Sequence, residues 1–251
     1  MLDGRHALVT GGGRGIGRAV AAVLTRAGAS VTILGRDTAA LSKTVAAGEA
    51  KGYVVADVTD DKAVASSFRQ AVRERGPIDI LVANAGIAES APFTKARTDQ
   101  FRKLFEFNVI GVVHTMQAVL ADMTARGFGR IVVNASVAGL KGYGYVSAYC
   151  ASKHAVVGLV RAVAQETVKS GVTVNAVCPG YTDTELVQKQ LENMMAKTGR
   201  SRDELLAEML HDEPLGRLIT PEEVAEAVLF LCGPRASAVT GTTLTIAGGE
   251  I

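Results

Sequence analysis

The chain has 251 residues, with 27 Lys and Arg against 25 Asp and Glu, a formal net charge of +2 at pH 7, and 48% hydrophobic residues. This length suits one large α/β domain or two small ones and allows a sizeable core. No run or stripe of basic residues occurs, so the composition argues against a nucleic-acid partner. No run of about 18 consecutive apolar residues occurs either, so we expect no membrane span.

The N-terminus and the cysteines bear on the compartment. Residues 1–5 lead at once into a strand-like run, so we expect no signal peptide and a cytoplasmic location. Cys150, Cys178 and Cys232 are odd in number and far apart, which fits neither a disulfide framework nor a zinc site. We expect reduced, structural cysteines and no metal.

Short runs rich in β-branched residues alternate with longer segments of helical periodicity. The expected strands cover residues 6–10, 30–34, 52–56, 78–83, 129–134, 172–178 and 242–246. The expected helices cover residues 17–28, 63–75, 99–125, 148–170 and 221–231. Strands that are apolar almost throughout are typical of a parallel sheet covered by helices on both faces. No linker or repeat divides the chain, so the sequence predicts a single α/β domain over residues 1–251 with a doubly wound parallel sheet.

One region breaks this alternation. Residues 183–218 contain two helical patterns rich in Met and Leu, at 186–197 and 202–211, between a strand and the last long helix. An excursion of this kind near the functional edge of a sheet is typical of a lid. We interpret residues 183–218 as a helical substrate lid within the domain.

A glycine-rich turn joins the first expected strand to a helix. Residues 10–17 read Thr-Gly-Gly-Gly-Arg-Gly-Ile-Gly. The free N–H groups and the dipole of a helix N-terminus favour a pyrophosphate, and glycines permit the turn and a close backbone approach. The alternative, a merely flexible loop, does not explain the flanking strand and helix. The sequence therefore predicts a dinucleotide site at Gly11, Arg14, Gly15, Ile16 and Gly17.

The end of the second strand bears on the kind of dinucleotide. A carboxylate there favours NAD by binding the 2′-hydroxyl of the adenosine ribose. This sequence has Gly35 and Arg36 instead, and Arg36 with Arg14 offers two cations for a 2′-phosphate, so we favour NADP(H) over NAD(H). The alternative is that both arginines are ordinary solvated charges. After the third strand, Asp57 and Val58 are expected at the adenine, although Asp57 also suits a turn.

Four polar residues form the candidate catalytic group. Tyr149 and Lys153 are four residues apart on one expected helix and so share a face. A neighbouring ammonium favours the phenolate form of a tyrosine, whose ordinary pKa is about 10. Ser136 follows an apolar strand, at the edge where ligands bind in open α/β sheets. Asn108 lies inside a long helix, where Asn is unfavourable unless its amide has local partners.

Each of these residues taken alone also suits a structural role, but together with the glycine turn they resemble the short-chain dehydrogenase/reductase family over essentially the whole chain. The resemblance implies a Rossmann fold and hydride transfer between a nicotinamide and a ketone or secondary alcohol. It implies that Tyr149 exchanges the proton with the substrate oxygen, that Ser136 orients this oxygen, and that Lys153 holds the nicotinamide ribose. Asn108 is then expected to anchor a water that carries protons from Lys153 to solvent.

Two further segments resemble elements of this family. Residues 179–184 look like the turn that binds the nicotinamide carboxamide, although Thr184 also precedes a helix and suits a cap. The motif after the fourth strand reads Ala-Asn-Ala-Gly, with Ala83 in place of the usual first Asn. From these two segments the resemblance adds seven residues to the cofactor site: Asn84, Ala85, Gly86, Pro179, Gly180, Thr182 and Thr184.

The substrate is less well specified. Residues 185–190 resemble the substrate loop of bacterial 3-hydroxybutyrate dehydrogenases, but only Gln190 matches the polar cage that holds a carboxylate there; Ala88, Ala138 and Val146 occupy the other three positions. A carboxylate buried without donors is unfavourable, so we expect an uncharged substrate. Residues expected around it are Leu140, Tyr143, Tyr145, Met194 and Met195.

We therefore favour reduction of a 3-oxoacyl thioester, carried by CoA or an acyl carrier protein, or the reverse reaction. The alternatives are an NAD-linked dehydrogenase of secondary or cyclic alcohols, a dehydrogenase of 3-hydroxy acids, and a nucleotide-sensing scaffold without activity. A scaffold is expected to lack the Tyr or the Lys, and both are present. The resemblance also implies a homotetramer.

Overall fold

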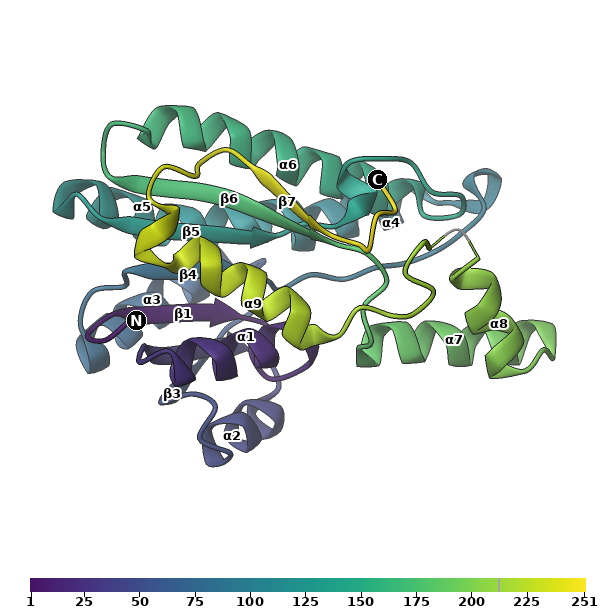
Figure 1. Ribbon diagram of the computed structural model, residues 1–251, viewed down its shortest axis with the longest axis horizontal. Coiled ribbons are helices and arrows are strands. Elements are labelled where there is room, and N and C mark those ends of the chain that lie inside the picture. Colours follow the sequence, from purple (N-terminus) through teal and green to yellow (C-terminus); the bar gives the residue numbers. More distant parts are fainter. Residues whose placement is uncertain (212) are drawn as a thin grey trace.

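The protein, described by a computed structural model over residues 1–211 and 213–251, is built around one seven-stranded parallel sheet (Figure 1). The strand order is β3-β2-β1-β4-β5-β6-β7. The strands are β1 His6–Thr10, β2 Ser30–Gly35, β3 Gly52–Val55, β4 Ile80–Ala83, β5 Gly129–Asn134, β6 Val172–Pro179 and β7 Thr243–Ile246. The α-helices are α1 Gly15–Arg26, α2 Thr38–Ala46, α3 Asp61–Arg75, α4 Thr98–Phe105, α5 Gly111–Arg126, α6 Ser147–Thr167, α7 Glu185–Thr198, α8 Arg202–Met209 and α9 Pro221–Cys232. The predicted doubly wound parallel sheet is confirmed, and its extent as a single domain stays a prediction.

Successive side chains of each strand pack alternately into two apolar cores on opposite faces of the sheet. In β1, Leu8 packs into the core beneath α3, α5 and α6, whereas Ala7 and Val9 pack into the core beneath α1, α2 and α9. Figure 1 shows these helices covering the two faces. Because successive side chains of a strand point to opposite faces, a strand covered on both sides is apolar throughout. All three cysteines are free and buried, and Cys178 and Cys232 belong to these two cores.

The expected helix over residues 99–125 is continuous but not regular. A π-helical segment, Glu106–Ile110, joins α4 to α5, and the amide of Gly111 donates to the carbonyl of Glu106 five residues earlier. By length and composition alone the joined helix Thr98–Arg126 is apolar enough to cross a membrane. Leu104 is fully buried and four apolar side chains of α5 pack into the sheet core, so packing accounts for part of this apolar composition, and 39% of the most apolar window is buried.

The other differences from the expected elements are at their ends, with one omission. Most boundaries move by one to three residues, as is usual for helix and strand termini. The helix α2 was not expected, because its nine residues bury only Leu41 and Thr44 and give little periodic signal. Asp37 caps it by accepting a hydrogen bond from the amide of Ala40.

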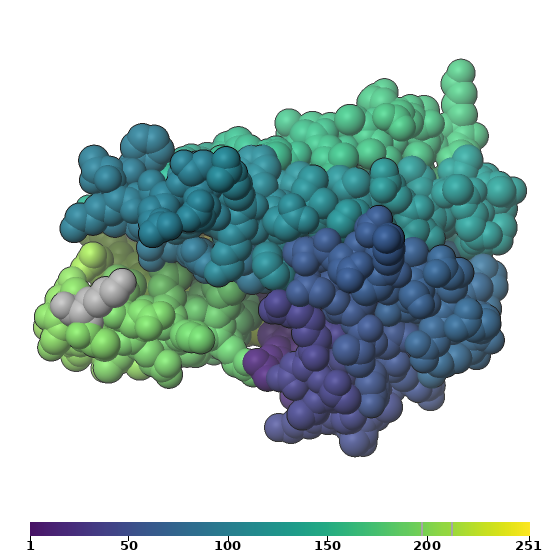
Figure 2. Space-filling model, turned by 180° about the vertical axis from the view of Figure 1, so that it is seen from behind, coloured from purple at the N-terminus to yellow at the C-terminus, as the bar shows by residue number. Residues whose placement is uncertain are grey.

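The expected lid contains the two helices α7 and α8, which pack against each other around a small apolar cluster of their own. Val187, Leu191 and Leu205 form its buried centre, and Met194 and Met195 pack against them. The helices form a separate lobe at one end of the molecule (Figures 1 and 2). Met194 and Met195 therefore serve the packing of this lobe, and the expectation that they lie over the substrate was wrong.

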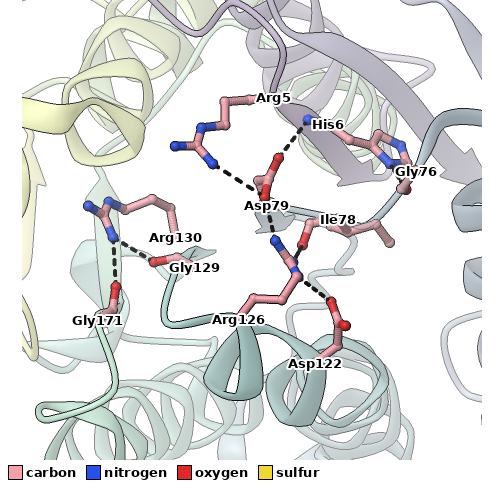
Figure 3. Close-up of polar contacts among 10 residues, drawn as sticks. All are labelled: Arg5, His6, Gly76, Ile78, Asp79, Asp122, Arg126, Gly129, Arg130 and Gly171. Atoms are coloured by element: carbon pink, nitrogen blue, oxygen red, sulfur yellow. Dashed lines mark hydrogen bonds and ion pairs between the residues drawn. The ribbon is translucent and has the colours of Figure 1, made fainter.

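A charged network lies at the edge of the sheet where β1, β4 and β5 begin (Figure 3). The side chain of Asp79 is 8% exposed and accepts hydrogen bonds from the amide of His6 at 3.2 Å and from Arg126 at 2.7 Å. Arg5 lies 3.5 Å from the same carboxylate, and Arg126 also reaches the exposed Asp122. Asp79 thus ties the start of β1 to the end of α5.

Replacement of Asp79 tests this network. We expect Asp79→Ala to lower the free energy of unfolding by about 3 kcal/mol, because it leaves the guanidinium of Arg126 and the His6 amide without their buried acceptor. Asp122→Ala removes a partner of the same arginine from an exposed position and is expected to cost less than about 1 kcal/mol. Urea unfolding of both variants measures the difference, and equal losses would contradict the assignment.

Candidate active site

The loops at the carboxyl edge of the sheet surround a groove that contains nearly every residue expected in the site. One part has a cavity volume of about 480 Å³ and extends from the glycine turn to the lid. A second part, of about 450 Å³, lies over the ends of β2 and β3 and shares Gly11, Arg14 and residues 85–87 with the first. Figure 2 shows the surface hollowed between the lid lobe and the N-terminal part of the chain. Open parallel α/β sheets bind ligands at this edge.

The glycine turn brings α1 close to the neighbouring strands. Gly11 and Gly15 have φ of +66° and +49°, which favour glycine. A Cβ atom on Gly17 would lie 2.3 Å from the carbonyl oxygen of Gly11. In the described structure, the first turn of α1 has no acidic residue and its N-cap residue, Arg14, makes no side-chain capping bond. The helix therefore presents free N–H groups to the groove, which suits the pyrophosphate of a dinucleotide.

The adenosine end of the groove contains a residue that the sequence reasoning missed. Asp37 lines it together with Arg36, Asp57 and Val58, and its carboxylate is ion-paired with Arg14. Arg36 is paired with Asp57 at 3.1 Å. Burial opposes ionisation of Asp57, but bonds from Thr59 and the charge of Arg36 hold its pKa below the ordinary value. Both arginines thus have acidic partners, and one of these, Asp37, lies two residues after Gly35.

The candidate catalytic side chains converge at the other end of the groove. Ser136, just after the end of β5, and Tyr149 and Lys153, on α6, line the same cavity. The Lys153 ammonium donates a 2.7 Å hydrogen bond to the carbonyl of Asn134 and lies 5.7 Å from the centre of the Tyr149 ring. The geometry therefore has the arrangement expected of an acid–base pair with an oxygen-binding hydroxyl beside it.

Burial dominates the ionisation of both groups on α6. It raises the pKa of Tyr149 to about 12, against the opposing effect of a hydrogen bond with Ser136. It also lowers the pKa of Lys153, which is 6% exposed, to about 8. Desolvation thus drives both side chains toward their neutral forms, and the expected stabilisation of the phenolate by the Lys153 ammonium stays a prediction.

Asn108 lies behind the cavity wall and does not line it. Its side chain accepts a 2.9 Å bond from the amide of Ile87 and donates to the carbonyl of Ile87 and to the hydroxyl of Ser152. The amide is thus occupied by protein partners, and the expectation that it anchors a water is not supported by its side chain. It lies in the π-helical segment, a feature frequent at functional sites, and fixes the loop beside Lys153.

Polar contacts also fix the loops that would hold the rest of a cofactor. Asn84 donates to the carbonyl of Thr10 and accepts from the side chain of Asn134. The buried Oδ1 of Asn134 has no partner among the described residues. Thr184 occupies the N-cap position of α7 without a capping bond from its side chain, and its hydroxyl donates a 3.3 Å hydrogen bond to the carbonyl of Thr182. The expected cofactor residues from these loops all line the cavity: Asn84, Ala85, Gly86, Pro179, Gly180, Thr182 and Thr184.

The substrate end of the cavity is mostly uncharged. Ala88, Ala138, Val146 and Gln190 line it, as expected, and Tyr143 lies with them. Leu140 instead packs against the core, and the side chain of Tyr145 is 71% exposed, so these two expectations were wrong. No group of His, Cys, Asp and Glu that would hold a metal occurs among the residues the structure describes.

Comparison with known proteins agrees with this geometry. A family model described as "Enoyl-(Acyl carrier protein) reductase" matches residues 11–250. The chain is 36% identical over 252 residues to D-beta-hydroxybutyrate dehydrogenase of Rhizobium meliloti (strain 1021), covering 98% of both chains. It is 37% identical over 248 residues to acetoacetyl-CoA reductase of Shinella zoogloeoides, again covering 98% of both.

A solved structure is similar over the same length. A variant of actinorhodin polyketide ketoreductase with NADPH has a TM-score of 0.94 and 35% identity, covering 100% of this chain and 99% of the other. The chain belongs to the short-chain dehydrogenase/reductase family. It is an NAD(P)-dependent oxidoreductase that acts on ketones or secondary alcohols, as the resemblance implied.

The ionisation of Lys153 predicts a pH dependence. We expect kcat/KM for ketone reduction to fall as the pH rises through about 8, because Lys153 then loses the proton that it holds near Tyr149. Oxidation of the corresponding alcohol is expected to rise over the same range, because it releases a proton that Tyr149 passes to the neutral amine of Lys153. Initial rates from about pH 6 to 10 in both directions measure this, and a reduction rate that is flat across the range contradicts it.

Proposed function

We propose that the protein is an NADP(H)-dependent reductase of 3-oxoacyl thioesters carried by CoA or an acyl carrier protein. The observation that carries the proposal is the uncharged wall formed by Ala88, Ala138 and Val146 in the cavity that contains Tyr149. A wall without a cation or a cage of donors leaves a free carboxylate uncompensated, whereas an acyl thioester is neutral there. The similarity to an acetoacetyl-CoA reductase supports the same substrate class.

Tyr149, Ser136 and Lys153 have separate roles in this reaction. In reduction, the hydroxyl of Tyr149, kept protonated by its raised pKa, donates its proton to the carbonyl oxygen. Ser136 donates a hydrogen bond to that oxygen and holds it beside Tyr149. Lys153, fixed by the carbonyl of Asn134, holds the ribose hydroxyls of the cofactor. The nicotinamide supplies the hydride when it is bound.

Asn108 is a positioning residue in this scheme. Its two bonds to Ile87 and one to Ser152 lock the loop 85–88 against α6. That loop lines both the cofactor groove and, at Ala88, the substrate end of the cavity. The cofactor and the substrate therefore share one wall whose position Asn108 sets.

The preference for NADP(H) follows from the two arginines of the groove. Arg14 and Arg36 are more than half exposed, so a 2′-phosphate is able to replace Asp37 and Asp57 as their partner without burying a charge. Phe107, with its ring centre 5.2 Å from the Arg36 guanidinium, fixes that side chain over the groove. The NADPH in the similar ketoreductase is consistent with this preference.

Turnover of a panel of ketones tests the substrate class. With NADPH we expect acetoacetyl-CoA to be reduced with a higher kcat/KM than aryl or cyclic ketones. The loss of nicotinamide absorbance measures each rate. Tyr149→Phe is expected to lower kcat by about 10³-fold while NADPH still binds, because only the proton donor is removed. Activity on the simple ketones alone would reject the thioester while leaving the reaction class intact.

A pair of substitutions tests the cofactor preference. We expect Arg36→Ala to raise KM for NADPH about tenfold and to leave KM for NADH nearly unchanged, since only NADPH carries the 2′-phosphate. Asp37→Asn is expected to strengthen the preference for NADPH by freeing Arg14. Arg97→Ala, which removes an exposed ion pair outside the groove, is the matched control. A wild type that prefers NADH, or an Arg36→Ala variant that loses both cofactors equally, contradicts the proposal.

The homotetramer implied by the resemblance and the cytoplasmic location expected from the N-terminal sequence stay predictions. Light scattering after size exclusion distinguishes a tetramer from a monomer of 26.1 kDa.

A further inference from the structure

The residues after β7 pack behind the wall of the site and contact Tyr143, which lines the cavity. After β7, Gly248 and Gly249 adopt φ of +59° and +95°, which turn the backbone back toward the cavity. A Cβ on Gly248 would lie 2.4 Å from that of Leu215, so this turn is packed tightly against the segment that follows the lid. The turn places the side chain of Glu250 in the interior, where it is 2% exposed.

Glu250 is held by the loop that connects Ser136 to Tyr149. The ammonium of Lys141 lies 2.8 Å from Oε1 of Glu250, and the hydroxyl of Tyr143 donates a hydrogen bond to the same oxygen. The other carboxylate oxygen, Oε2, is buried without a partner among the described residues, beside Gly180. Burial of a charged carboxylate costs free energy, and only Oε1 has polar partners that offset this cost.

The hydrogen bond to Glu250 determines whether Tyr143 donates or accepts a hydrogen bond toward a substrate. Tyr143 lines the cavity, and its single hydrogen is given to Glu250. Burial and that hydrogen bond raise the pKa of Tyr143 well above its ordinary value, and Glu213 acts in the same direction. The phenol therefore keeps its proton and presents only an acceptor oxygen to the cavity.

The same arrangement also balances a cation behind the substrate end, the ammonium of Lys141, which lies 5.0 Å from the centre of the Tyr143 ring. Lys141 would otherwise be a positive charge next to Tyr143, but its charge is balanced by Glu250. Burial likewise raises the pKa of Tyr181, with Glu213 and Glu250 contributing, so this second tyrosine of the wall is also neutral. A substrate carboxylate at this wall would meet an acceptor oxygen and a neutralised ion pair.

We propose that Glu250 is a positioning and specificity-determining residue that, through Tyr143 and Lys141, excludes anionic substrates and selects neutral carbonyl compounds. The proposal rests on the reductase activity proposed above, but not on the thioester itself. Glu250 touches neither substrate nor cofactor. It sets the direction of the phenol hydrogen and the net charge of the wall.

Two substrates that differ in charge at the same 3-oxo group test this proposal: acetoacetate and its neutral ethyl ester, each with NADPH. Wild type is expected to prefer the ester. In Glu250→Gln the ammonium of Lys141 loses its counter-charge, and the amide is able to donate. We expect the ratio of kcat/KM for acetoacetate to that for the ester to rise about tenfold, mainly through a lower KM for acetoacetate.

Two further variants separate this role from a merely structural one. Adding Lys141→Gln to Glu250→Gln is expected to return the ratio close to that of wild type, because the uncompensated cation is gone. Glu74→Gln, an exposed carboxylate on α3 outside the cavity, is the matched control and is expected to leave the ratio unchanged. Thermal unfolding of each variant shows that it is folded.

The outcomes are distinct. A folded Glu250→Gln enzyme with an unchanged ratio, or with equal losses for both substrates, overturns the proposal. If Glu250→Gln does not fold, Lys141→Gln alone is the test: the negative charge of Glu250 is then less compensated and the ratio must fall severalfold, and no change overturns the proposal. If wild type reduces neither substrate nor any other ketone, the proposed function has failed instead.

Discussion

The parallel pairing of all seven strands is the constraint on which the rest of this structure depends. Parallel pairing brings the carboxyl ends of β1, β4, β5 and β6 to one edge, and each of these ends passes directly into a loop of the site. The register is fixed by burial on both faces, because a shift of one residue would exchange the side chains of the two cores. Thr10, the last residue of β1, shows the result: its hydroxyl accepts from the amides of Asn84 and Ala85, so the glycine turn and the loop after β4 are held together.

Burial explains why this edge is reactive as well as ordered. Tyr149 and Lys153 are enclosed enough that desolvation shifts both pKa values toward the neutral forms, to about 12 and about 8. An enclosed tyrosine that keeps its proton is a ready acid for a carbonyl oxygen, and an enclosed lysine near neutrality exchanges its proton readily. When a positively charged nicotinamide ring lies beside them, the balance moves toward the phenolate, which is the form that the reverse reaction requires.

The sequence was sufficient to predict the parts of the site that depend on spacing along the chain. Tyr149 and Lys153 share a helix face at any sheet geometry, and the glycine turn needs only a strand before it and a helix after it. It was insufficient for contacts between distant segments. Asp37 resembles an ordinary helix cap until the fold brings Arg14 to it, and nothing local marks Glu250, whose partners are 107 and 109 residues away. Asn108 lies between these cases: its unfavourable position in a helix pointed to a role, but its partners Ile87 and Ser152 required the fold.

The ion pairs at the two ends of the groove differ in solvent exposure, and therefore in how readily a ligand can replace one partner. At the adenosine end, Arg14 and Arg36 are exposed, so their acidic partners compete with a ligand phosphate in water and the energy differences are small. At the substrate end, the carboxylate of Glu250 is only 2% exposed, so its contacts to Lys141 and Tyr143 are less screened than the exposed ion pairs. Selection between neutral and anionic substrates is therefore expected to be stricter than selection between the two cofactors, because the first depends on buried charge and the second on exposed charge.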